Sequence, residues 1–158
     1  MRNITKTVYL FSELSDRAKE KAREWWRQGD PTAWDDDSLD SIKAFCTEFG
    51  VTLRDYSVAP YSRPTYSVDA DNSNFRGRKL REFNRDAMPT GYCLDCPLWQ
   101  TFCDEWKKTG DPKQSFDSAL HAAFNEWRDD REYQLSDESI DETIEANEYE
   151  FDEKGAVA

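Results

Sequence analysis

The C-terminal arm of the chain, residues 129–154, most constrains the fold because it combines dense charge with a regular apolar pattern. From Asp129 to Glu153 it holds twelve of the 33 acidic residues, and Arg131 is its one basic residue. The whole chain has a net charge of −12, so nearly all of the excess negative charge lies in this arm. The arm must therefore turn its few apolar side chains to a core and its carboxylates to solvent.

The spacing of apolar residues in the arm predicts a helix, a turn and a strand. Ser136 is a good N-cap, and the acids that follow it suit the positive end of a helix dipole. Ile140 and Ile144 are four residues apart and share one helix face. Asn147 is suited to end the helix in a left-handed turn. Aromatic and acidic residues then alternate through 148–152, the pattern of a half-buried strand.

The remaining chain alternates between strand-like and helix-like patterns. β-branched and aromatic residues predict strands over 4–11, 51–58 and 64–70, in addition to 148–152. Apolar stripes predict a helix that Ser15 caps and Gly29 ends, a second helix after the Asp35–Ser38 run, and further helices on both sides of Gly110. This order predicts an α+β fold with a small, mainly antiparallel four-stranded sheet and helices packed on one face. The strands 51–58 and 64–70 should form a hairpin, and both terminal strands should join the same sheet.

Length and composition indicate one globular domain over residues 1–158. The chain is 14% aromatic with six tryptophans, although its mean hydropathy is −0.95. Large rings in a polar chain indicate a compact core under a charged exterior. No segment has the length of a membrane span and no signal peptide opens the chain, so we expect a cytoplasmic protein with reduced cysteines.

The cysteines raise the question of a metal site. Cys93 and Cys96 form a C-x-x-C pair, and a structural zinc ion needs four ligands. Cys46, Cys103 and His121 are candidates to complete the set, but both of these cysteines fall on apolar helix stripes. We therefore predict no bound zinc. Metal binding by Cys93 and Cys96 is an alternative that the sequence leaves open.

Other chemical motifs are weak. The acidic run at 35–37 suits a helix start, and a divalent cation site is the alternative. A single histidine without a nucleophile motif makes no triad, and glycine-rich phosphate loops are missing from the sequence. We expect no enzyme activity and no cofactor.

A basic segment lies in the middle of the chain. Its basic residues are Arg76, Arg78, Lys79, Arg81 and Arg85. It reads as an exposed helix face, as an internal counter-charge for the acidic arm, or as a short nucleic-acid contact.

Both ends of the chain resemble a known family. The stretch Tyr9–Arg27, which contains Ser-Glu-Leu-Ser-Asp-Arg-Ala-Lys-Glu-Lys-Ala-Arg-Glu-Trp-Trp, resembles the opening of small acidic proteins encoded by bacteriophages and prophages. The stretch Glu132–Phe151 is similar to their ending, and Ser41–Cys46 and Asn72–Gly77 are similar too. Some members carry the label of antitoxin of a toxin–antitoxin stability system. The resemblance implies a phage or prophage origin and a bacterial cytoplasm, and it brings no site residues.

Two hypotheses of function follow. In the first, an acidic anti-defence protein, comparable to an anti-CRISPR protein or DNA mimic, inhibits a basic, nucleic-acid-binding host protein. Its contacts would be the exposed carboxylates of the arm, chiefly Asp137, Glu138, Asp141, Glu142 and Glu145. In the second, an antitoxin-like or regulatory module acts by protein–protein contact or through residues 76–85. Neither hypothesis involves a membrane, and neither fixes the oligomeric state.

Overall fold

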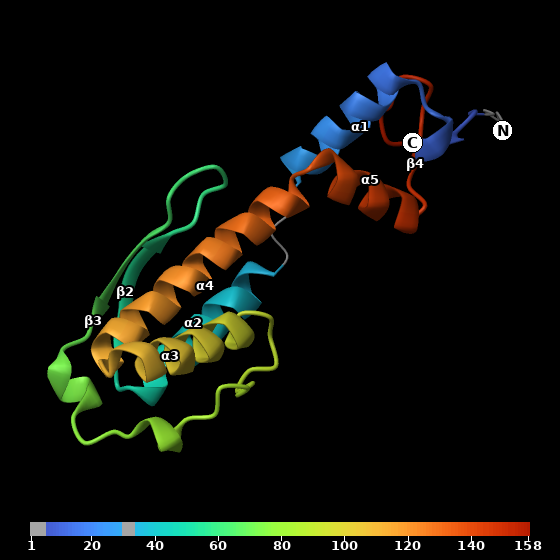
Figure 1. The fold of residues 1–158 in the computed structure, drawn as a ribbon. Coiled ribbons are helices and arrows are strands. Elements are labelled where there is room, and N and C mark those ends of the chain that lie inside the picture. Colours follow the sequence, from blue (N-terminus) through green and yellow to red (C-terminus); the bar gives the residue numbers. More distant parts are fainter. Residues whose placement is uncertain (1–5, 30–33) are drawn as a thin grey trace, which may run out of the picture. The chain divides into compact units, whose positions relative to one another are not determined.

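The computed structural model describes residues 6–29 and 34–158, whose contacts divide into two compact units (Figure 1). Unit 1 joins the N-terminal segment up to residue 32 to residues 132–158, and unit 2 spans residues 33–131. Each unit has its own buried core. The sequence predicts one globular domain, whereas the contacts define two units, and each is described by itself below.

Unit 1 is built from the two ends of the chain. Its elements are β1 (Tyr9–Leu10), α1 (Asp16–Gln28), α5 (Asp137–Ala146) and β4 (Glu150–Phe151). The strands pair antiparallel, with Tyr9 opposite Phe151. The core beneath them contains the buried residues Phe11, Leu14, Ala18, Ala22, Ile140, Ile144 and Phe151.

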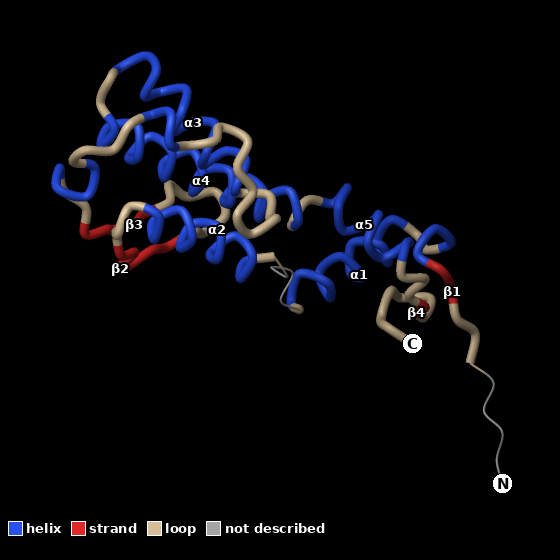
Figure 2. Tube along the Cα trace, turned by 90° about the horizontal axis from the view of Figure 1, so that it is seen from below, coloured by secondary structure: helices blue, strands red, loops and turns tan. Residues whose placement is uncertain are grey.

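Unit 2 contains a β-hairpin and three helices. Its elements are α2 (Asp35–Glu48), β2 (Thr52–Ser57), β3 (Thr65–Asp69), α3 (Asp95–Thr109) and α4 (Pro112–Gln134), of which residues 132–134 belong to unit 1. The hairpin packs one face on α4, where Tyr66 stacks on Phe124 with ring centroids 4.4 Å apart. Between β3 and α3 the chain forms two short 3-10 turns, Asn72–Phe75 and Leu80–Glu82. Figure 2 shows how small the strand content is beside the helices.

The α+β class and the antiparallel pairing are confirmed, but the single four-stranded sheet is wrong. The described strands form two separate two-stranded sheets, β1 with β4 and β2 with β3. The chain ends do pair with each other, and the predicted hairpin is present. The error arose because strand-like patterns identify strands without identifying their partners.

Several local predictions need correction. The predicted strand 4–11 is reduced to β1, and its residues 4 and 5 lie outside the described ranges. The acidic run at 35–37 forms the first turn of α2 and does not precede it. Asn147 has a φ of −93°, and the left-handed conformation falls one residue later, at Glu148. Ser15 and Ser136 act as N-caps as predicted. Within the described ranges, no helix is both long and apolar enough to cross a membrane.

Candidate functional site

The acidic arm contains the short helix α5, which is anchored to the core of unit 1. The Ser136 hydroxyl accepts a hydrogen bond from Ser139 N at 3.3 Å, which satisfies one of the open donors of the first turn. Ile140 and Ile144 are fully buried in the core of unit 1. The helix therefore presents its remaining faces in a defined orientation.

Two of the predicted contact residues are engaged within unit 1. Asp141 accepts hydrogen bonds from Arg23 Nε at 2.7 Å and from Arg23 Nη2 at 2.6 Å, a bidentate pair. Asp137 pairs with Arg27 and lies 3.5 Å from Arg23 Nη1. The hydrogen bond to Asp141 raises the pKa of Arg23, so the guanidinium stays charged. Asp141 is half-buried, contrary to its predicted exposure.

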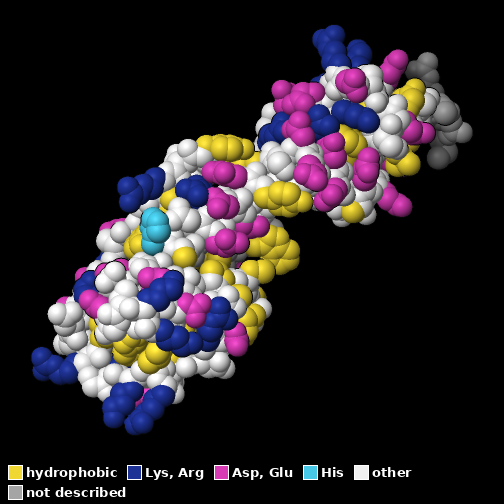
Figure 3. Space-filling model, viewed as in Figure 1, with side chains coloured by type: hydrophobic (Ala, Val, Ile, Leu, Met, Phe, Trp, Pro, Cys, Tyr) yellow, Lys and Arg dark blue, Asp and Glu magenta, His cyan; other side chains and the backbone are white. Residues whose placement is uncertain are grey.

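The other three predicted residues form an exposed ridge, hereafter the α5 ridge, of Glu138, Glu142 and Glu145. Their spacing of four and three residues places them along one face of the helix. None of them forms an ion pair with another described residue. Figure 3 shows acidic side chains, with basic ones among them, on the face of unit 1 that is in view. Asp137 and Asp141 do not belong to this ridge, because they turn to α1.

The basic segment does not form an α-helix face, and two of its arginines pair with acids of unit 2. Arg78 pairs with Glu48 at 2.8 Å and its guanidinium lies 4.7 Å from the Phe83 ring centroid. Arg85 binds both oxygens of Asp104, at 2.8 and 2.9 Å. These bonds stay within unit 2, and α1 supplies the described counter-charges of α5. Arg76, Lys79 and Arg81 are exposed, so the segment offers fewer available cations than the sequence suggested.

The cysteines divide into two pairs. Cys46 and Cys103 are buried in unit 2 as predicted, and burial raises the pKa of Cys46 to about 12. Cys93 and Cys96 are exposed thiols at the start of α3. Over residues 6–29 and 34–158, no three His, Cys, Asp or Glu side chains are grouped as a metal site would require.

The acidic run of α2 has a structural role. Asp35 Oδ1 accepts hydrogen bonds from Trp127 Nε1 at 2.6 Å and from Arg131 Nε at 2.9 Å. It thereby ties the first turn of α2 to α4. A cation at residues 35–37 would have to displace these bonds.

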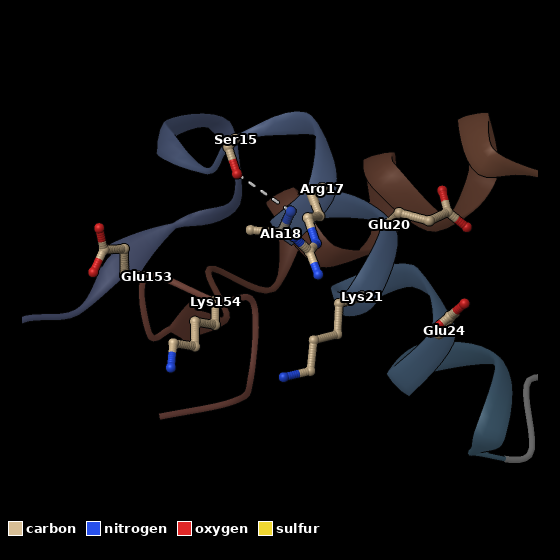
Figure 4. A pocket seen from close by; sticks show the side chains of 8 residues that line it. All are labelled: Ser15, Arg17, Ala18, Glu20, Lys21, Glu24, Glu153 and Lys154. Carbon is tan, nitrogen blue, oxygen red and sulfur yellow. Dashed lines mark hydrogen bonds between the residues drawn. The ribbon is translucent and has the colours of Figure 1, made fainter.

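A hollow of about 640 Å³ lies at the start of α1 and beside the C-terminal turn. In Figure 4, Lys21 and Lys154 point to the same side, while Glu20 and Glu24 point away from them. Because the lining carries both signs of charge, it favours no single class of ligand.

A second cleft, hereafter the aromatic cleft, was missed by the sequence reasoning. It measures about 460 Å³ and is lined by Trp34, Asp37, Ser38, Gly91, Tyr92, Cys93, Leu94, Glu126, Trp127 and Asp130. Its residues come from the start of α2, the loop before α3, and α4. Three segments so far apart carry no common sequence signal.

No protein-family model, no curated protein and no solved structure matches the chain.

Proposed function

We propose that this protein binds a basic surface of a partner protein through the α5 ridge. The observation that carries the proposal is the division of the acids of α5. Asp137 and Asp141 are neutralised by α1, whereas Glu138, Glu142 and Glu145 are exposed without an ion pair among the described residues. Like charges at these spacings destabilise an isolated helix by about 0.2–0.5 kcal/mol per pair. The helix dipole favours Glu138 in the first turn, but it gives no such reason for Glu142 and Glu145, while a cationic partner would account for all three.

The ridge is preorganised for such a contact. Ile140 and Ile144 anchor the opposite side of α5 in the core, and Arg23 holds Asp141 by two hydrogen bonds. A partner would therefore meet carboxylates on a helix that is already ordered. Preorganisation lowers the entropy lost on binding.

We further propose that the partner is a basic, nucleic-acid-binding host protein. The net charge of −12 and the resemblance to phage-encoded acidic proteins support this choice. A surface that binds phosphates attracts carboxylates by the same long-range field. An antitoxin-like role through residues 76–85 has less support, because Arg78 and Arg85 are engaged with acids of unit 2.

The proposal is tested by capture of partners from bacterial lysate with the immobilised full chain. Glu138→Gln, Glu142→Gln and Glu145→Gln are combined in a ridge variant. We expect the ridge variant to lose the protein that the wild type captures, since rim charges control association with a charged partner.

The matched control removes three other exposed acids of unit 1, by Glu24→Gln, Glu150→Gln and Glu153→Gln. This control variant changes the net charge equally and should keep the partner. Equal loss in both variants would indicate attraction by net charge alone, and equal retention would remove the ridge from the interface.

A further inference from the structure

The aromatic cleft of unit 2 combines two features that the function proposed above does not use. Trp34 is 62% exposed and Tyr92 is 39% exposed, although both are large apolar side chains. The volume of about 460 Å³ lies within the range of small-ligand sites, roughly 300–1,000 Å³. Exposed rings beside a concave surface indicate a binding site more than isolated exposed residues do.

The floor of the cleft is rigid. Trp127 is 3% exposed, and its indole N–H donates to Asp35 at 2.6 Å. Its polar group is therefore satisfied inside the protein, and the ring contributes an apolar surface to the cleft. On the other side, the loop Gly91–Leu94 is fixed by Asp95, whose Oδ2 accepts hydrogen bonds from Thr90 N and Gly91 N, each at 2.9 Å.

The rim of the cleft is acidic. Among its ten described lining residues, three are acidic and none is basic. Asp37 lies in the first turn of α2, and Glu126 is exposed on α4. The N-terminus of α2 contributes a positive partial charge of about half a unit, and the acids of that turn exceed it. Arg131 pairs with Asp35 beside the cleft, and its guanidinium lies 5.8 Å from the Trp127 ring centroid. The rings open to a ligand are therefore those of Trp34 and Tyr92, next to the carboxylates of Asp37 and Glu126.

We propose that the aromatic cleft binds an arginine side chain of a basic peptide segment in a partner protein. Aromatic faces attract cations, and carboxylates neutralise them. A guanidinium fits both groups better than an ammonium, because it is planar, weakly hydrated and able to stack on rings while it donates to carboxylates. The cleft belongs to unit 2, so this proposal does not depend on the α5 ridge.

The probe is a short, acetylated and amidated glycine-flanked peptide with one arginine, added to the full chain. Binding is followed in ¹H–¹⁵N NMR spectra by the indole signal of Trp34, assigned by its loss in Trp34→Phe. We expect saturable shifts of this signal and of the Gly91 and Tyr92 amides. The same peptide with lysine should bind several-fold more weakly, and the peptide with neutral citrulline should give no saturable shift.

Three outcomes would overturn the proposal. Equal binding of the citrulline peptide would show that charge has no part, and equal binding of the lysine peptide would remove the guanidinium preference. The absence of saturable shifts with the arginine peptide would contradict the site itself.

Variants locate the site and separate it from the α5 ridge. Asp37→Asn combined with Glu126→Gln should weaken arginine binding about fivefold or more, because two carboxylate contacts are lost. The ridge variant of α5 should bind the arginine peptide as the wild type does. If only the ridge variant loses binding, the peptide binds to unit 1 and the proposal for the cleft fails.

The two exposed thiols provide a second test of location. Cys93 lines the cleft and Cys96 does not. Modification of Cys93 with N-ethylmaleimide in a Cys96→Ser protein should abolish the response to the peptide. Modification of Cys96 in a Cys93→Ser protein should leave the response in place, and the reverse pattern would contradict the cleft as the site.

Discussion

The two units are stabilised in different ways. Among the described residues of unit 2, eighteen are buried in one cluster, and the aromatic rings form two contact networks, one around Phe45 and Phe49 and the other around Phe124. Among the described residues of unit 1, seven are buried in its core, which is the smaller of the two. Both units have ion pairs, and those of unit 1 join Arg23 and Arg27 to α5. A small core supplies little hydrophobic free energy, so charged bonds carry a larger share of the stability in unit 1. The acids of α5 therefore divide into two groups: Asp137 and Asp141 pair with α1 inside unit 1, and Glu138, Glu142 and Glu145 are exposed. The second group is the one that we propose for a partner.

The largest expected loss of stability follows a substitution in the aromatic core of unit 2. Phe45 is fully buried, stacks on Phe116 at 5.2 Å and meets Trp99 at 5.0 Å. Phe45→Ala should lower the free energy of unfolding by about 3–5 kcal/mol, measured by urea denaturation. Trp34→Ala removes a larger but exposed ring of the same unit and should cost much less. Similar losses in both variants would contradict a stability based on this core.

A smaller effect is expected at the C-terminal turn of unit 1. Gly155 has a φ of +81°, and a Cβ atom there would lie 2.1 Å from the Ala18 carbonyl oxygen. Gly77 has a similar φ of +78° with no atom within 4 Å of such a Cβ. Gly77→Ala should lower the free energy of unfolding by about 1–2 kcal/mol, because alanine is strained in the left-handed conformation. Gly155→Ala should lower it more, because the C-terminal turn must also move away from α1. Thermal denaturation of both variants measures the difference, and equal costs would mean that the turn does not pack on α1.

The ion pairs of unit 1 should contribute a modest, salt-dependent amount. A double-mutant cycle with Arg23→Gln and Asp141→Asn should give a coupling free energy of about 1 kcal/mol at low salt. The coupling should fall in 1 M NaCl, because salt screens charges. The exposed pair Arg54–Asp69 in unit 2 is the control and should couple more weakly. A salt-independent coupling in unit 1 would argue against the charged contribution.

The smallest effect is a pH dependence of the C-terminal turn. Hydrogen bonds from the Ala156 and Lys154 amides lower the pKa of Asp152. A lowered folded pKa means that the stabilisation is present above the ordinary carboxyl pKa and is lost as the pH falls through the folded value. NMR titration should therefore show the Ala156 amide shifting below the ordinary range of aspartate. A midpoint at the ordinary carboxyl pKa would contradict these bonds.

Local features were predictable from the sequence and long-range features were not. Ser15 and Ser136 act as N-caps as predicted, because capping depends on a few neighbouring residues. Arg23 and Asp141 are 118 residues apart, and nothing in either segment identifies the other as its partner. The acidic arm was correctly expected to contain a helix, but which acids face outward depended on where α1 packs. The aromatic cleft was missed for the same reason, since its three segments meet only in the folded chain.

We propose that the α5 ridge, and not the net charge, attracts a basic partner. The direct measurement is the association rate of the captured partner with the wild type, the ridge variant and the matched control variant, from low to high salt. We expect a slower association rate and a flatter salt dependence for the ridge variant alone. Identical rates and identical salt dependence in all three proteins would contradict it and would leave the ridge as a solvated surface.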